Sequence, residues 1–242
     1  MEGGCMRPFA ILIAGFITIL YMQIVPEGPW SDVLLQYPPF SLLEGDLPGY
    51  ALRMMATTLL FGVLPLFCVS SDCRTQRLGL NRPQKNPFHD PLFLLTLLVF
   101  PGLSTLSGFD STMASFYPYS VTLTGSGLGG IVLHLLIYTV FYYLPWELFF
   151  RGFLILPLLP DGADTSPSSD FRWMFFASVQ IIPSALAHPG HPIQELFAAL
   201  PFGMVCGYCV LRYRSIWPGF LLHVLTGLAL DITVLLHWGG SA

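Results

Sequence analysis

Residues 127–159 read GLGGIVLHLLIYTVFYYLPWELFFRGFLILPLL, an apolar stretch whose charged side chains are Glu147 and Arg151. The stretch is longer than the roughly 20 residues that a membrane-spanning helix needs. Residues four apart share one face of a helix, so the carboxylate and the guanidinium can pair. Each charge left alone at membrane depth would cost at least roughly 2.5–3.5 kcal/mol. An acid with a partner at that depth indicates a functional site.

The composition of the whole chain excludes an ordinary soluble domain. Hydrophobic residues make up 54% of the 242 residues and charged residues only 10%, against about 25% charged in typical soluble domains. The mean hydropathy is +0.66. We therefore expect an all-α fold, a polytopic transmembrane helical bundle forming one integral membrane domain over residues 1–242. The sequence has no basic patch typical of nucleic-acid binding, so the bilayer, not a nucleic acid, is the expected environment.

The apolar pattern predicts seven or eight membrane spans. Pro145 removes a backbone donor, so residues 127–159 form either one long bent helix or a helix and a shorter second one. The segment from Asp161 to Asp170, rich in Ser, Asp, Pro and Gly, is predicted to be a surface loop. The expected spans are residues 9–25, 50–70, 91–107, 127–144, 147–159, 173–187, 193–211 and 216–236.

Lys and Arg in the loops predict the orientation of the bundle. Residues 71–90 contain four basic side chains and are expected on the cytoplasmic side, whereas residues 26–49 contain four acidic ones and no base. Arg212 and Arg214 also lie on the cytoplasmic side if residues 127–159 cross the membrane once. Two crossings would place these arginines outside, and the sequence leaves both counts open.

Glu147 has a structural and a functional interpretation. In the first, it forms an ion pair with Arg151 that locks two helices together. In the second, it is a general base that activates water, because a carboxylate in a dry site is a better base near neutral pH. Arg151 would then hold the carboxylate in its ionised form.

Two further candidates flank a short turn. His188 lies at the end of a predicted span, and Pro189 directly after it terminates the helix. Glu195 lies in the first turn of the next predicted helix, where an acidic side chain interacts favourably with the helix dipole. Glu195 could also form a hydrogen bond with His188 across the turn and set its tautomer. We interpret His191, between them, as a loop residue.

The last predicted span carries the remaining candidates. His223 lies in its middle, with apolar residues for a full turn on each side. Asp231 follows eight residues later, a little over two turns, and either pairs indirectly with His223 or approaches the far interface. His134, in the stretch that opens this section, is interpreted as a packing residue.

The residue types favour acid–base chemistry on water, with no cofactor required. Two histidines and a glutamate are also zinc ligand types, so a divalent metal such as zinc is the alternative. The H-E-x-x-H helix motif of metalloproteases and the G-x-S-x-G motif of serine hydrolases are both absent.

In order and spacing these residues resemble a known family, the CAAX prenyl protease and bacteriocin-processing (Abi) family of intramembrane glutamic proteases. The resemblance covers approximately residues 127–236, a protease-like core. The pieces that carry it are Glu147-Leu-Phe-Phe-Arg151-Gly152-Phe153, His188, Phe202-Gly203, Gly207 and Ser215-Ile-Trp-Pro-Gly219 leading to His223.

Two positions depart from the family pattern. The family motif opens with two glutamates, and Trp146 occupies the first of these positions. The family places Asn four residues after the last His, where this chain has Gly227, so an oxyanion-stabilising amide is missing and Thr226 or a backbone amide would have to replace it. The chain looks more like a bacterial branch with a single Glu, because Pro192, Glu195 and Asp231 fit that branch.

The resemblance implies an intramembrane endopeptidase of the bacterial inner membrane that acts on a membrane-embedded or lipidated peptide or protein. Glu147 and His188 would activate water and His223 would stabilise the oxyanion. Arg151, Glu195 and Asp231 would support them. The alternatives are an inactive family member that serves as a membrane binding, chaperone or immunity protein, and a proton-coupled transporter that uses Glu147 as a relay.

Overall fold

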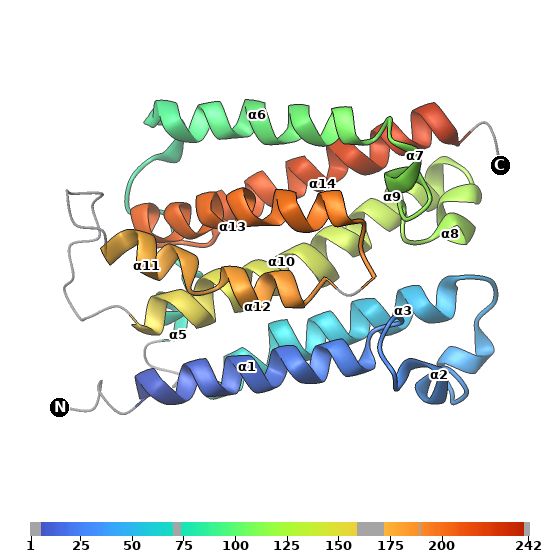
Figure 1. Cartoon of the computed structure of the whole chain (residues 1–242), viewed down its shortest axis with the longest axis horizontal. Coiled ribbons are helices and arrows are strands. Elements are labelled where there is room, and N and C mark those ends of the chain that lie inside the picture. Colours follow the sequence, from blue (N-terminus) through green and yellow to red (C-terminus); the bar gives the residue numbers. More distant parts are fainter. Residues whose placement is uncertain (1–5, 70–73, 159–171, 189, 240–242) are drawn as a thin grey trace.

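The described part of the chain is a helical bundle whose long helices run side by side (Figure 1). The structure, a computed structural model, describes residues 6–69, 74–158, 172–188 and 190–239. No strand occurs among these residues, which confirms the all-α prediction. The predicted loop Asp161–Asp170 lies outside the described residues.

Six long helical segments build the bundle, and shorter helices connect them. The long segments are α1 (Met6–Ile24), α3–η2–α4 (Leu47–Thr57, Thr58–Val63, Leu64–Cys68), α6 (Pro91–Ser107), α9–η5–α10–η6 (Leu128–Tyr138, Thr139–Tyr143, Leu144–Glu147, Leu148–Phe153), α13 (Ile193–Tyr213) and α14 (Trp217–Trp238). The short ones are α2 (Ser31–Leu34), η1 (Phe40–Leu42), α5 (Arg74–Arg77), η4 (Pro87–His89), α7 (Ser111–Ala114), α8 (Val121–Gly125), η7 (Leu156–Leu158), α11 (Arg172–Ser178) and α12 (Ile181–Leu186).

Pro145 lies inside one uninterrupted helix, Leu128–Phe153. Of the two arrangements predicted for this stretch, the structure therefore shows the single long helix. A π-helical turn, Thr139–Tyr143, comes directly before this proline. The widened turn fits a residue that lacks an N–H and whose ring crowds the carbonyl one turn back. The same arrangement recurs where the π-helical turn Thr58–Val63 precedes Pro65.

In the part of the chain that the structure describes, four helices are long and apolar enough to cross a membrane. They are Leu47–Cys68, Leu128–Phe153, Ile193–Tyr213 and Trp217–Trp238, while α6 and the described part of α1 are shorter apolar helices. The structure therefore does not confirm the predicted count of seven or eight spans.

The predicted span 173–187 is divided into α11 and α12. The break falls at buried Gln180, whose side-chain amide donates to the carbonyls of Ala177 and Gly203 at 3.1 and 2.8 Å. The first bond satisfies a carbonyl at the end of α11, where the helix is interrupted, and the second joins the break to α13.

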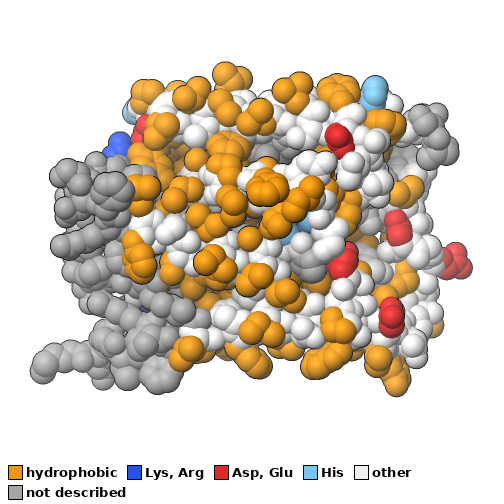
Figure 2. Space-filling view, in the orientation of Figure 1, with side chains coloured by type: hydrophobic (Ala, Val, Ile, Leu, Met, Phe, Trp, Pro, Cys, Tyr) orange, Lys and Arg blue, Asp and Glu red, His pale blue; other side chains and the backbone are white. Residues whose placement is uncertain are grey.

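Apolar side chains cover the flank of the bundle, whereas the acidic side chains in this view gather mainly at one end (Figure 2). The loop that joins α1 to α3 lies at that end, and the turn between α13 and α14 lies at the other end, with the N-terminus (Figure 1). Because Leu128–Phe153 is one helix, Arg212 and Arg214 fall at the same end as the basic segment 74–85, which agrees with the charge pattern of a membrane protein. The chain is an integral membrane protein.

Gly152 allows the long helix to approach the segment before η4 closely. A Cβ built at this position would overlap the carbonyl oxygen of Leu78, a backbone atom that cannot move aside. We expect Gly152→Ala to lower the free energy of unfolding by about 1–3 kcal/mol, the usual cost of overpacking. Gly102→Ala, in α6 with open space around it, is the matched control and should be neutral or stabilising. Equal melting temperatures for the two variants would contradict this packing.

Candidate active site

Glu147 and Arg151 form a buried ion pair in the long helix, as their spacing predicts. The side chains are 0% and 2% exposed, and Nη1 of Arg151 lies 3.2 Å from Oε1 of Glu147. The second carboxylate oxygen, Oε2, is buried without a hydrogen-bond partner and faces Gly219 of α14, where a Cβ would lie 3.0 Å from it. A larger residue at 219 would therefore press on the carboxylate.

His223 of α14 completes this buried unit. Its Nδ1 lies 2.8 Å from Oε1 of Glu147. Because an ionised carboxylate only accepts hydrogen bonds, Nδ1 carries the proton, and in the neutral ring Nε2 carries the lone pair. Glu147 thus fixes the tautomer of His223. The ring also contacts Tyr143 and Phe202, with centroid separations of 4.6 and 5.1 Å.

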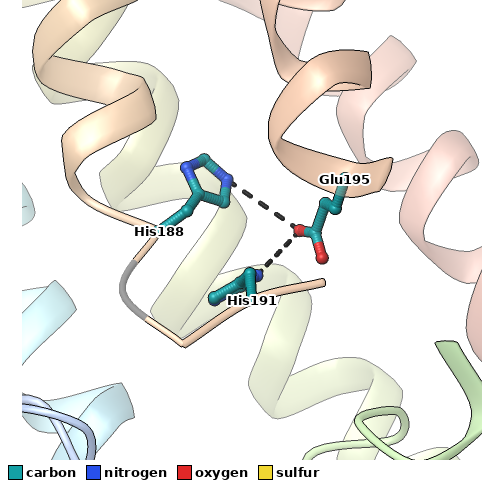
Figure 3. A group of neighbouring side chains, drawn as sticks. All are labelled: His188, His191 and Glu195. Carbon is teal, nitrogen blue, oxygen red and sulfur yellow. Dashed lines mark ion pairs between the residues drawn. The ribbon is translucent and has the colours of Figure 1, made fainter. Parts of the chain in front are cut away.

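His188 is oriented by the end of α12. Its Nδ1 lies 2.6 Å from the carbonyl oxygen of Ser184, which can only accept, so Nδ1 carries the proton. Nε2 points toward Glu195, with 3.9 Å between it and Oε1 (Figure 3). At this separation the two side chains do not form the direct hydrogen bond considered from the sequence. The indole of Trp146 packs edge-on against the His188 ring at 4.9 Å.

His191 also contacts Glu195 and is not a plain loop residue. Its side chain is 1% exposed, and its Nδ1 lies 2.9 Å from Oε1 of Glu195 (Figure 3). Its Nε2 lies 2.7 Å from the hydroxyl oxygen of Tyr119. Tyr117 donates a 2.8 Å hydrogen bond to the same Glu195 oxygen. Burial, with the Glu195 charge as a further cause, raises the pKa of Tyr117, so its hydroxyl stays protonated and keeps donating.

One cavity of about 260 Å³ joins the two histidine clusters. His188, Glu195 and His223 all line it, whereas Glu147, which contacts His223, does not. The rest of its wall is largely aromatic and aliphatic. These residues include Phe100, Met113, Tyr138, Tyr142, Phe202 and Leu230.

Tyr143 occupies the space that a side chain at position 227 would fill. A Cβ at Gly227 would overlap the Tyr143 hydroxyl, and both residues line the cavity. Thr226, considered from the sequence as a substitute donor, gives its hydroxyl proton to the carbonyl of Leu222 at 2.8 Å. The Tyr143 hydroxyl therefore lies where the side chain of the family's Asn would begin, and it can donate a hydrogen bond there.

Asp231 pairs with His134 and not with His223. The carboxylate Oδ2 lies 3.3 Å from Nε2 of His134, and the two side chains are 1% and 0% exposed. The interpretation of His134 as a packing residue without polar company is therefore wrong. Two residues 97 positions apart meet here, and only the packing of α9 against α14 could reveal the pair.

The structure thus sorts the six predicted site residues into three groups. Glu147, Arg151 and His223 lie together, His188 and Glu195 form a second group that lines the same cavity, and Asp231 pairs with His134. Sequence reasoning missed the roles of Tyr117, Tyr119 and His191 around Glu195. The i,i+4 spacing of His191 and Glu195 was the one signal in the sequence for that contact.

A comparison with known protein families matches the part of the chain that contains the candidate site residues. Residues 128–229 match the model of the Rce1-like family, described as type II CAAX prenyl endopeptidase Rce1-like. Searches of curated proteins and of solved structures gave no match. The matched region begins with the long helix and ends in α14, so it contains Glu147, His188 and His223. Residues 128–229 of this chain are therefore similar to the Rce1-like family of CAAX prenyl endopeptidases, whose model they match.

Proposed function

We propose that the chain is an intramembrane endopeptidase that hydrolyses a membrane-embedded or lipidated peptide with water activated by the Glu147–His223 pair. The observation that carries this proposal is the 2.8 Å contact between the buried Glu147 carboxylate and the partly buried His223 ring, which lines a cavity also lined by His188. The family match favours a protease over the alternative of an inactive binding or chaperone protein.

The chemistry needs one base and one acid in turn. Nε2 of neutral His223 takes a proton from water while the water oxygen attacks the peptide carbonyl carbon. The protonated ring then gives that proton to the departing amine nitrogen, so the C–N bond breaks and the base is restored. Glu147, at 2.8 Å, stabilises the positive charge that the ring carries between these steps.

In this proposal Glu147 is a positioning residue that acts through His223, and not the general base expected from the sequence. Its carboxylate is 0% exposed and does not line the cavity, so it acts on water through His223. Arg151 pairs with the carboxylate at 3.2 Å and orients it in turn. His188 faces the same cavity and would orient the water or the substrate.

Tyr143 is the donor proposed for the oxyanion that develops on the substrate carbonyl. Its ring packs on His223 and its hydroxyl occupies the place of a side chain at 227. A donor fixed in advance in a water-poor site stabilises developing negative charge strongly. Gly227 therefore leaves room for another donor and does not mark a lost function.

The cavity wall fits an apolar substrate segment. Aromatic and aliphatic side chains dominate it, and His188, Glu195 and His223 contribute polar groups. A lipidated cysteine or an apolar peptide segment entering from the bilayer would lie against such a wall. We also propose that the protein belongs to a bacterial branch of the family with a single Glu in its motif and that it resides in the bacterial inner membrane.

The protein reconstituted in lipid vesicles tests this function. The probe is a quenched fluorescent peptide that ends in a prenylated cysteine and three further residues, compared with the same peptide without the prenyl group. We expect cleavage that His223→Gln abolishes. Binding of the peptide without cleavage would favour the binding or chaperone alternative instead.

A further inference from the structure

The turn between α12 and α13 brings three potential metal ligands together (Figure 3). His188, His191 and Glu195 each offer one ligand atom, and these atoms lie within 4.8 Å of one another. Gly190, between the two histidines, takes a φ of +74°, a conformation that glycine adopts readily. Helix α13 then begins at Ile193 and places Glu195 in its first turn.

We propose that His188, His191 and Glu195 form a binding site for a divalent transition-metal ion of the zinc type. Zinc binds nitrogen and oxygen ligands at 2.0–2.2 Å, so tetrahedral ligand atoms lie about 3.3 Å apart. Oε1 of Glu195 lies 2.9 Å from Nδ1 of His191 and 3.9 Å from Nε2 of His188. These two separations lie on either side of the tetrahedral value, and all three ligand atoms lie within 4.8 Å of one another, so modest side-chain shifts would bring them to one ion.

The groups behind the ligands hold them as metal-binding histidines are usually held. Nδ1 of His188 donates to the Ser184 carbonyl, so its Nε2 lone pair faces the cluster. Nε2 of His191 lies 2.7 Å from the Tyr119 hydroxyl, which can accept from that nitrogen once an ion replaces the proton on Nδ1. Each imidazole therefore has a partner for the nitrogen that does not face the ion.

The charge around the cluster also favours a cation. Arg53 approaches Nε2 of His191 to 3.5 Å, but its guanidinium is paired with Glu27. With neutral imidazoles, Glu195 then contributes one uncompensated negative charge. Its Oε2 atom is buried and has no hydrogen-bond partner, the condition that a bound ion or its water would relieve.

His188 and Glu195 line the cavity, so the ion would have protein ligands on one side and an open position on the other. Three protein ligands and one open position are typical of catalytic zinc sites, whereas structural sites have four. His223 lines the same cavity, so a water molecule or carbonyl oxygen on the ion would share this space with it. The proposal goes beyond the hydrolase function and does not depend on it.

Calorimetric titration of the purified, untagged protein with Zn²⁺ alone tests the site, and Co²⁺ absorption reports the ligand types. We expect one ion per chain, with no thiolate-to-cobalt charge transfer because cysteine is not a ligand. Tyr119→Phe should weaken binding about 10–100-fold, as loss of a group behind a ligand does, and Glu195→Gln and His191→Gln should weaken it further.

Two controls keep the result interpretable. The double variant His89→Gln/His237→Gln removes exposed imidazoles outside the cluster and should bind as wild type does. Glu147→Gln should also bind normally, so loss of proteolysis and loss of the metal site are distinguishable. Absence of saturable one-to-one binding, or unchanged affinity in Glu195→Gln and His191→Gln variants that melt like wild type, would overturn the proposal.

Discussion

Glu147→Gln should lower kcat for peptide cleavage about 10²–10⁴-fold, the range for a missing acid–base contribution. The amide is nearly isosteric, but it carries no charge to stabilise protonated His223 and can present the wrong group to Nδ1 at 2.8 Å. The measurement is the initial rate of peptide cleavage in vesicles at saturating substrate.

The matched control is Glu44→Gln, the same chemical change at an exposed position between η1 and α3, which should leave the rate unchanged. A double variant separates catalysis from folding. If Glu147 acts through His223, Glu147→Gln/His223→Gln should be no slower than His223→Gln alone. Full activity in Glu147→Gln with a lowered melting temperature would show instead that the pair with Arg151 is structural.

Tyr143→Phe should lower kcat about 10²–10³-fold, the usual cost of removing one oxyanion donor. KM should stay nearly constant, because the hydroxyl would bind a charge that develops only in the transition state. The ring remains, so its packing against His223 at 4.6 Å is retained. The measurement is kcat and KM for the prenylated peptide.

Tyr142→Phe is the control for this prediction, since the neighbouring phenol also lines the cavity. We expect a change of less than about threefold there, well below the cost of a lost oxyanion donor. Equal losses in the two variants would mean that the phenols shape the cavity and that neither is a specific donor.

The membrane bundle was largely predictable from the sequence, because apolar length and the positions of Lys and Arg report on burial in lipid directly. The Glu147–Arg151 pair was predictable too, since both residues belong to one helix and their spacing alone brings them together. The continuity of the helix through Pro145 was not, because it depends on a π-helical turn that leaves no signature in composition.

Contacts between helices that are far apart in the chain could not be predicted from the sequence. The pairing of Asp231 with His134, and of His223 with Glu147, depends on the rotation of α14 about its axis. His191 looked like a loop residue because Pro189 and Pro192 enclose it, yet the same turn directs its side chain to Glu195. The overlap of Tyr143 with the space beside Gly227 likewise follows from the packing of two helices 84 residues apart in the chain.

The most direct test of the central claim is a comparison of membrane-protein termini in cells that lack the protein, cells that express it, and cells that express Glu147→Gln at the same level. If the Glu147–His223 pair activates water for peptide hydrolysis, new termini should appear with the wild-type protein and be absent with the variant. Identical termini in wild-type and Glu147→Gln cells would contradict the account.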